Sequence, residues 1–111
     1  MIRVDIYLRE GKIKGFNVSG HAEFDDSGKD IVCAGVSILT FNTIDAFTDI
    51  LKIKKYIQYS IEDNHIELIL NKELDKEKMH DAQLILKKYE LGIQSILKEY
   101  SDYIELYYTE V

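Results

Sequence analysis

The chain switches several times between two hydrophobic periods, and the order of these switches limits its fold more than any other feature. Residues 2–9 alternate apolar and polar side chains, as a strand with one buried face does. Residues 79–100 instead carry apolar side chains at steps of three and four, which places one apolar stripe along a helix. A chain with both periods must pack a sheet against helices.

The other segments complete this series. The predicted elements are strands at 2–9, 12–19, 56–62, 65–70 and 104–108, and helices at 31–51 and 79–100. The order along the chain is therefore ββαββαβ. We expect one α+β domain over residues 1–111, with a mostly antiparallel sheet and two helices.

Local residue types predict the connections between these elements. Glu10-Gly11 predicts the turn of the first hairpin, and Asp63-Asn64 predicts that of the second, because both residue types tolerate positive φ. Gly15 inside a strand predicts a bulge or a close backbone approach. The segment 23–29 is polar apart from Phe24 and predicts a mobile loop.

Charge and composition limit the classes of function. The chain has 46% hydrophobic and 31% charged residues, which is typical of a soluble globular protein. Its formal net charge of −6 argues against nucleic acid as a direct partner, since phosphate binding needs a concentrated positive surface. An acidic protein instead attracts basic partners.

The chain has features of a cytoplasmic protein. Its single cysteine cannot form an internal disulfide, which suits a reducing compartment. The first ten residues alternate charged and apolar side chains, unlike a signal peptide. The nearly apolar run at 31–41 is shorter than the roughly 20 residues that span a bilayer, so we expect no membrane association. Eight tyrosines and an apolar first helix leave apolar surface to spare, which is compatible with a homodimer.

The residues around the single cysteine suggest a nucleophilic site. Asp30 stands where the N-cap of the first helix is expected, which would put Cys33 in the first helical turn. The positive end of the helix would favour the thiolate, which is the reactive form of cysteine. His21 could accept the thiol proton and later return it, while unpaired helical N–H groups held an oxyanion. Ser37 follows Cys33 by one turn and could donate a hydrogen bond within the site.

Simpler interpretations of the same residues stay open. A lone cysteine in an apolar run is more often a packed small hydrophobe than a nucleophile. Asp30 alone is more often a structural cap, and Ser37 a small packing residue. A metal site formed by His21, Cys33, His65 and His80 is disfavoured because their spacing matches no zinc pattern, so we expect neither a metal nor another cofactor.

Two short motifs resemble a known family. The letters GHA at 20–22 and GKDIVCAGVS at 28–37 are similar to motifs of the ribosomal-processing cysteine protease Prp family. The resemblance implies that Cys33 is the nucleophile and that His21 is the proton donor and acceptor. Four further positions match the motifs and are candidate supporting residues: Gly20, Asp30, Ala34 and Ser37.

The resemblance also implies a substrate and an assembly state. Members of this family remove a short N-terminal extension, which ends near aromatic residues, from ribosomal large-subunit protein twenty-seven, as ribosome assembly requires. They are dimers with a flexible loop between the two motifs. The chain departs from the family pattern at Glu23, Ser27 and Gly35, which concerns loop closure and substrate fit. An alternative function is a ribosome-assembly factor that binds a ribosomal protein without cutting it.

Overall fold

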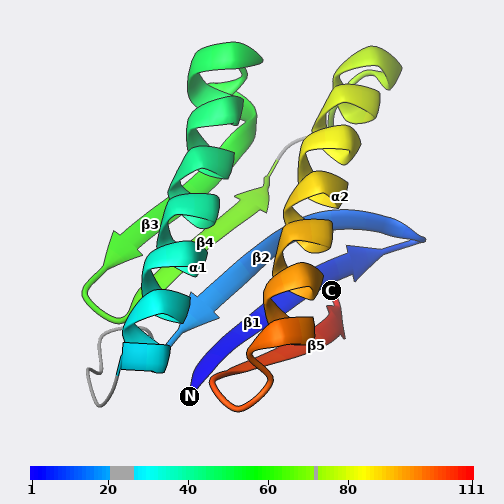
Figure 1. Ribbon diagram of the computed structural model, residues 1–111. Coiled ribbons are helices and arrows are strands. Elements are labelled where there is room, and N and C mark those ends of the chain that lie inside the picture. The colour runs from blue at the N-terminus through cyan, green and yellow to red at the C-terminus, as the bar shows by residue number, and fades with distance from the viewer. Residues whose placement is uncertain (21–26, 72) are drawn as a thin grey trace.

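Five strands form one sheet, and two long helices lie on one of its faces (Figure 1). The computed structural model describes residues 1–20, 27–71 and 73–111, with backbone only for 27–29. The elements are β1 (Ile2–Arg9), β2 (Lys12–Ser19), α1 (Ser27–Asp45), a π-helical turn η1 (Ala46–Ile50), a 3₁₀ turn η2 (Lys54–Tyr56), β3 (Ile57–Glu62), β4 (His65–Leu70), α2 (Lys76–Glu99) and β5 (Ile104–Glu110). The predicted α+β class and the order ββαββαβ are confirmed.

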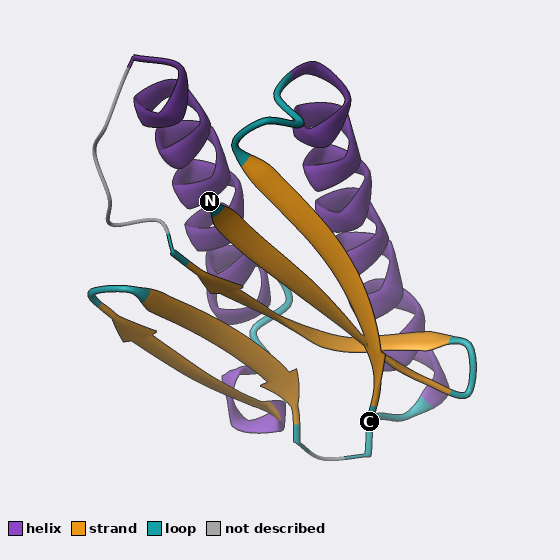
Figure 2. Cartoon of the chain, turned by 90° about the horizontal axis from the view of Figure 1, so that it is seen from below, coloured by secondary structure: helices purple, strands orange, loops and turns teal. Residues whose placement is uncertain are grey.

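The sheet is antiparallel except at one edge. Its strand order is β3-β4-β2-β1-β5, and only the pair β1–β5 is parallel. Figure 2 shows the resulting two layers, with α1 and α2 together on one face of the sheet. The strands alternate accordingly: Ile2, Val4 and Ile6 of β1 are buried against the helices, whereas Arg3 points to the opposite face and is exposed.

The opposite face of the sheet is polar, which explains why it needs no cover. Tyr7 of β1 donates a hydrogen bond to Glu67 of β4 over 2.7 Å, and Thr109 of β5 donates one to Asp5 over 2.9 Å. Partial burial, followed by the hydrogen bond to Glu67, raises the pKa of Tyr7 to about 12. Cross-strand pairs of this kind hold the register of the central strands.

The start of α1 differs from the prediction. The helix begins at Ser27 rather than at residue 31, so the expected loop over 23–29 is wrong for residues 27–29, while residues 23–26 lie outside the described part. Asp30 is consequently a residue of the first turn and is not the N-cap. Its carboxylate still lies near the positive end of the helix, where a negative charge is favourable.

The first hairpin turns as predicted, and the second does so with a different backbone. Glu10 and Gly11 have φ values of 52° and 78°, the left-handed pair that a tight hairpin turn favours. Asp63 and Asn64 also form a two-residue turn, but neither has a positive φ, so the positive φ expected there is wrong.

The expected irregularity at Gly15 is confirmed in both of its forms. Tyr7 pairs with Gly15 whereas Leu8 pairs with Ile13, so one residue bulges from β2 between them. A Cβ atom on Gly15 would also come within 2.0 Å of the Leu68 carbonyl oxygen. The bulge and the close approach of β4 therefore require glycine at this position.

The helix layer is fixed by a buried aromatic group. The ring of Tyr89 in α2 stacks on Phe16 of β2 with a centroid distance of 4.3 Å. Its hydroxyl is 2.9 Å from the hydroxyl of Thr40 in α1, and both residues are fully buried. Gly92, one turn later in α2, leaves room for Leu39, whose Cδ2 atom would lie 2.6 Å from a Cβ there. These contacts fix α1 against α2 and the sheet.

The helical segment Asp30–Ile50 is long and apolar enough to cross a bilayer, with a mean hydropathy of 1.5. Core helices of soluble proteins meet the same criterion. Here the segment packs on the sheet and on α2, and 44% of it is buried inside the protein. Its hydropathy is therefore largely explained by its place in the core, although Ile38 on its outer side is 71% exposed.

Replacement of Tyr89 by phenylalanine should destabilise the protein by about 1–3 kcal/mol, because it leaves the buried hydroxyl of Thr40 without this partner. Urea unfolding of the wild type and of Tyr89→Phe measures the difference. The double variant Thr40→Val/Tyr89→Phe is the control, since it removes both polar groups and should recover part of the loss. A double variant less stable than Tyr89→Phe would contradict this account of the pair.

Candidate active site

Cys33 lies in the second turn of α1, at the end of the helix layer where α2 finishes. Its side chain is 6% exposed and belongs to the hydrophobic core, together with the fully buried Val36. The helices are antiparallel (Figure 1), and Ile96 near the end of α2 approaches Gly35, with its Cδ1 atom 3.8 Å from a Cβ placed there. The packing of the core thus positions the sulfur.

The early helix start changes the surroundings expected for the thiol. Only the first four N–H groups of a helix lack helical acceptors, and in a helix that begins at Ser27 all of them precede Asp30. Cys33 is therefore not in the first turn, and its own N–H group is not one of the four. Donors for an oxyanion would come from the turn preceding the sulfur, so the expectation that the turn of Cys33 supplies them is wrong.

The predicted supporting residues of α1 lie on different sides of the helix. Ser37 is half-buried and follows Cys33 by one turn on the same face. Asp30 precedes Cys33 by three residues and is exposed, so its carboxylate faces solvent at the start of the helix. Ala34 is exposed and points away from the core. The structure thus brings Asp30 and Ser37, but not Ala34, to the side of α1 that carries Cys33.

Gly20 has a structural reason to be glycine. It directly follows β2 and has a φ of 79°, which side chains other than glycine rarely adopt. A Cβ atom would also lie 2.4 Å from the carbonyl oxygen of Met1. The glycine of the GHA motif therefore lets the chain leave β2 beside the start of β1. His21, which follows it, lies outside the described residues.

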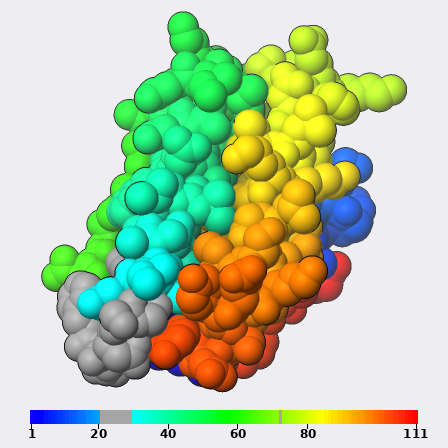
Figure 3. All heavy atoms as spheres, viewed as in Figure 1, coloured from blue at the N-terminus to red at the C-terminus, as the bar shows by residue number. Residues whose placement is uncertain are grey.

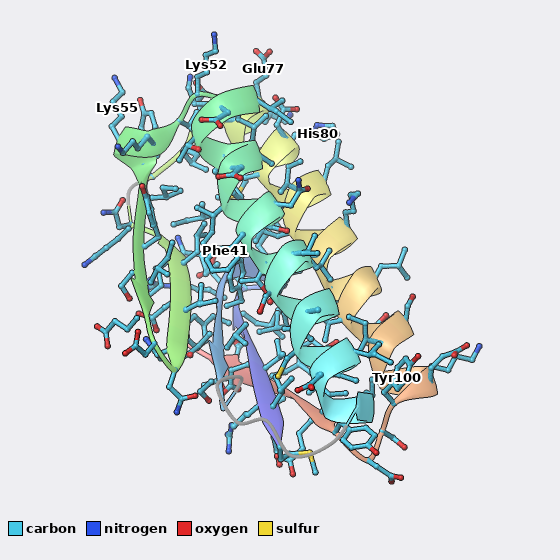
Figure 4. All side chains as sticks on the ribbon, turned by 60° about the vertical axis from the view of Figure 1, so that its left-hand side comes forward. Phe41, Lys52, Lys55, Glu77, His80 and Tyr100 are labelled. Atoms are coloured by element: carbon cyan, nitrogen blue, oxygen red, sulfur yellow. The ribbon has the colours of Figure 1, made fainter. Side chains whose placement is uncertain are left out.

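The row that begins at Cys33 continues to Phe41, which the sequence analysis did not single out. Cys33, Ser37 and Phe41 are spaced by four residues and so share one side of α1. Figure 4 shows Phe41 on the side of α1 that faces β3 and β4. We call these three residues the Cys33 row.

The Cys33 row faces apolar side chains of an edge strand. In β3, Tyr59 pairs with Leu68 and Ile61 with Ile66, so both point to the helix side of the sheet. They are nevertheless 37% and 50% exposed, because α1 does not cover the edge strand. The sequence analysis predicted a strand here, but the position of β3 at the sheet edge cannot be deduced from its pattern.

The end of the molecule that holds Cys33 is acidic. The start of α1, the β3–β4 turn and the end of α2 lie together there (Figure 1). The exposed carboxylates at this end include those of Asp30, Glu62, Asp63, Glu99 and Asp102. Such a surface attracts a positively charged polypeptide.

No metal site is evident in the part of the chain that the structure describes. It contains no group of three or more His, Cys, Asp or Glu side chains that could hold an ion. His65 lies at the start of β4, whereas His80 lies in the first turns of α2 and is exposed. Figure 4 shows His80 at the end of the molecule opposite Tyr100, which follows α2.

Comparison with known proteins identifies the family. Residues 1–105 match the model of the family described as cysteine protease Prp. The chain belongs to the Prp family of cysteine proteases. A Staphylococcus aureus relative named ribosomal processing cysteine protease Prp is 34% identical over 109 residues, which cover 97% of this chain and 99% of the relative. A Bacillus subtilis relative of the same name is 27% identical over 92% of each chain.

Solved structures agree with this assignment. The S. aureus Prp in complex with a substrate peptide superposes with a TM-score of 0.82 at 30% identity, covering 98% of this chain and 100% of that one. A Streptococcus mutans structure has a TM-score of 0.85 at 22% identity, covering 100% and 96% of the two chains, and shows the same fold. This Prp chain is therefore a cysteine protease, a hydrolase of peptide bonds.

Replacement of Gly20 by alanine should destabilise the protein more than the same change at Gly11. Both glycines have nearly the same φ, 79° and 78°, so the cost of a left-handed alanine, about 1–2 kcal/mol, should be the same at both positions. Only at Gly20 does the new Cβ meet a backbone atom, since nothing lies within 4 Å at Gly11. Urea unfolding of the two variants isolates the contact with Met1, and equal losses would disprove its importance.

Proposed function

We propose that this Prp protease removes the N-terminal extension of ribosomal large-subunit protein twenty-seven, with Cys33 as nucleophile and His21 as its acid and base. The main support is the match of residues 1–105 to a protease family whose S. aureus and B. subtilis members are named for ribosomal processing. The acidic end around Cys33 suits a ribosomal protein rich in lysine and arginine. This substrate places the enzyme in the cytoplasm, where ribosomes assemble.

The first half of the reaction forms an acyl-enzyme. His21 takes the proton from the Cys33 thiol, and the thiolate attacks the carbonyl carbon of the scissile peptide bond. A C–S bond forms, the carbonyl oxygen becomes negatively charged, and the N–H groups of the first turn of α1, which have no acceptor within the helix, are the nearest helical donors for it. His21 then gives its proton to the leaving amine as the C–N bond breaks.

The second half restores the enzyme. Water loses a proton to His21 and attacks the thioester carbon, so that a C–O bond forms and the C–S bond breaks. Cys33 leaves as a thiolate and regains its proton from His21. The reaction needs neither a metal ion nor another cofactor, since the thiolate and the imidazole carry every proton and electron pair that moves.

The apolar side chains beside the Cys33 row are suited to the substrate. Phe41 is 38% exposed, and Tyr59 and Ile61 present further apolar surface from β3. An extended peptide that lies between them would bury its own apolar or aromatic side chains there, next to the sulfur. An alternative is that the first hairpin holds the peptide. The apolar side chains Ile13, Phe16 and Val18 of β2 are buried, so they offer no comparable exposed apolar surface.

Incubation with the extended ribosomal protein should lower the mass of that protein by the mass of its extension. Cys33→Ala should abolish this change in mass, because Cys33 is the single cysteine of the chain and no other thiol can replace it. Cys33→Ala should remain folded, since a small residue replaces a small one in the core. Mass spectrometry measures the products, and circular dichroism controls for folding.

The same assay separates cleavage from binding. An unchanged substrate mass with the wild type, together with stable complex formation, would favour the assembly factor that binds without cutting. Cleavage retained by Cys33→Ala would exclude Cys33 as the nucleophile. A substrate whose aromatic residues before the cut are replaced by serine should be cleaved more slowly, and equal rates would argue against the apolar site beside the Cys33 row.

The outer side of α1 supports the expected homodimer. Ile31 and Ile38 are 57% and 71% exposed and lie two turns apart beside the exposed Ala34. Leu91 of α2 is 63% exposed next to Gly92, which faces α1. Figure 3 shows the two helices forming one continuous face. A second copy that covers this helix face would bury large apolar side chains that water otherwise contacts.

Light scattering coupled to size exclusion should give twice the chain mass for the wild type. Ile38→Glu should give the mass of one chain, because a charge at the centre of an apolar interface must lose its hydration. Val111→Glu is the matched control, since Val111 is 56% exposed but follows β5, outside the helix face. A dimer with Ile38→Glu, or a monomeric wild type, would contradict an interface on α1.

A further inference from the structure

A groove lies between the β1–β2 hairpin and the beginning of α2, far from Cys33. Two adjoining hollows of about 470 and 640 Å³ share Lys12, Leu74 and Met79 in their walls. The side-chain amide of Gln83 fixes the two walls together, because it donates to the carbonyl of Ile13 over 2.8 Å and accepts from its N–H group over 2.9 Å. We call this region the hairpin groove.

The hairpin groove is strongly basic, although the protein is acidic. Five cationic side chains line it, against only two carboxylates: Arg9, Lys12, Lys14, Lys76 and Lys87 against Glu10 and Glu73. None of the five cations forms an ion pair with any residue that the structure describes. The lining of the groove therefore carries an excess of positive charge.

The hairpin groove and the acidic end with Cys33 lie at opposite ends of α2. Residues of the first turns of α2 line the groove, whereas the start of α1 lies beside the last turns of α2 (Figure 1). The exposed Asp75 and Glu77 also lie at the start of α2 but do not line the groove. Met79 and Ile96 are separated along α2 by about 25 Å, at the usual rise of 1.5 Å per residue. Two ligands of opposite charge can consequently bind at the two ends at the same time.

We propose that the hairpin groove binds the phosphate backbone of RNA while the acidic end holds the basic protein substrate. Lysine side chains are mobile point charges that bind phosphates without reading the bases, so the groove should bind RNA with little sequence preference. The choice of RNA over an acidic protein rests on the proposed function, because ribosomal proteins lie against ribosomal RNA. The enzyme would then recognise its substrate together with the RNA that surrounds it.

A fluorescent oligouridylate of about 12 nucleotides tests this proposal by anisotropy, with the full-length enzyme and without any protein substrate. The wild type should bind, and binding should weaken steeply as salt rises from 50 to 200 mM. Lys12→Gln/Lys76→Gln/Lys87→Gln should weaken binding at least tenfold at 50 mM salt. Loss of three phosphate contacts should also reduce the slope of log K against log salt by about 2, at about 0.7 per contact with a single strand.

A matched triple variant separates the groove from net charge. Lys52→Gln/Lys54→Gln/Lys55→Gln removes the same charge from exposed lysines that do not line the groove; Lys52 and Lys55 are shown in Figure 4. Its affinity should change by less than about threefold. If both triple variants weaken RNA binding equally, the binding depends only on the net charge of the protein, and the proposal is overturned. Circular dichroism should show both variants folded.

Two further results would also overturn the proposal. One is the absence of RNA binding by the wild type at 50 mM salt. The other is stronger binding of fluorescent polyglutamate than of the oligouridylate, which would assign the groove to an acidic protein. Because no protein substrate is present, each of these results is independent of whether Cys33 cleaves ribosomal protein twenty-seven, so the two proposals can fail separately.

Discussion

The hydrogen bond between Thr40 and Tyr89 fixes the rotation of α1, and the orientation of the site depends on it. Tyr89 is itself held by stacking on Phe16 of the central sheet, so the hydroxyl that Thr40 meets has a defined position. Leu39, the neighbour of Thr40, packs against Gly92 so closely that a Cβ atom at Gly92 would lie 2.6 Å from its Cδ2 atom. With α1 fixed in this way, the side carrying Cys33 must face β3 and β4. Helix packing thus sets the direction of the Cys33 side chain.

The fold was largely predictable because its buried faces are long and regular. The stripe of α2 and the alternation in β1 leave little choice of element type, and the bulge at Gly15 follows from a glycine inside a strand. The start of α1 was not predictable from the same signals. Asp30 is a preferred cap residue directly before an apolar run, whereas residues 27–29 are polar and carry no periodic signal, although their backbone is helical.

The cysteine protease activity was predictable from the sequence motifs, but the surroundings of Cys33 were not. The position of Cys33 and Ser37 on one helix face follows from their spacing of four residues. The side chains opposite them come from β3, which is an edge strand only because of the strand order. The distribution of charge was likewise not predictable, because a net charge of −6 does not tell where in the fold the lysines lie. The net charge argued against binding of nucleic acid, yet the fold brings five cationic side chains together in the hairpin groove.

The exposure of the Cys33 row increases along α1, and this gradient would limit how a peptide lies there if the row is the proposed substrate site. Cys33 is 6% exposed, Ser37 is half-buried and Phe41 is 38% exposed. A substrate can therefore make its apolar contacts at the open end of the row, where water is displaced most easily, while only its scissile carbonyl has to approach the buried sulfur. Binding at Phe41 would supply the free energy that brings the carbonyl to Cys33. If Cys33 is the nucleophile, as proposed, the apolar contacts near Phe41 would determine where the chain is cut, and the core packing of Cys33 would hold the attacking atom in place.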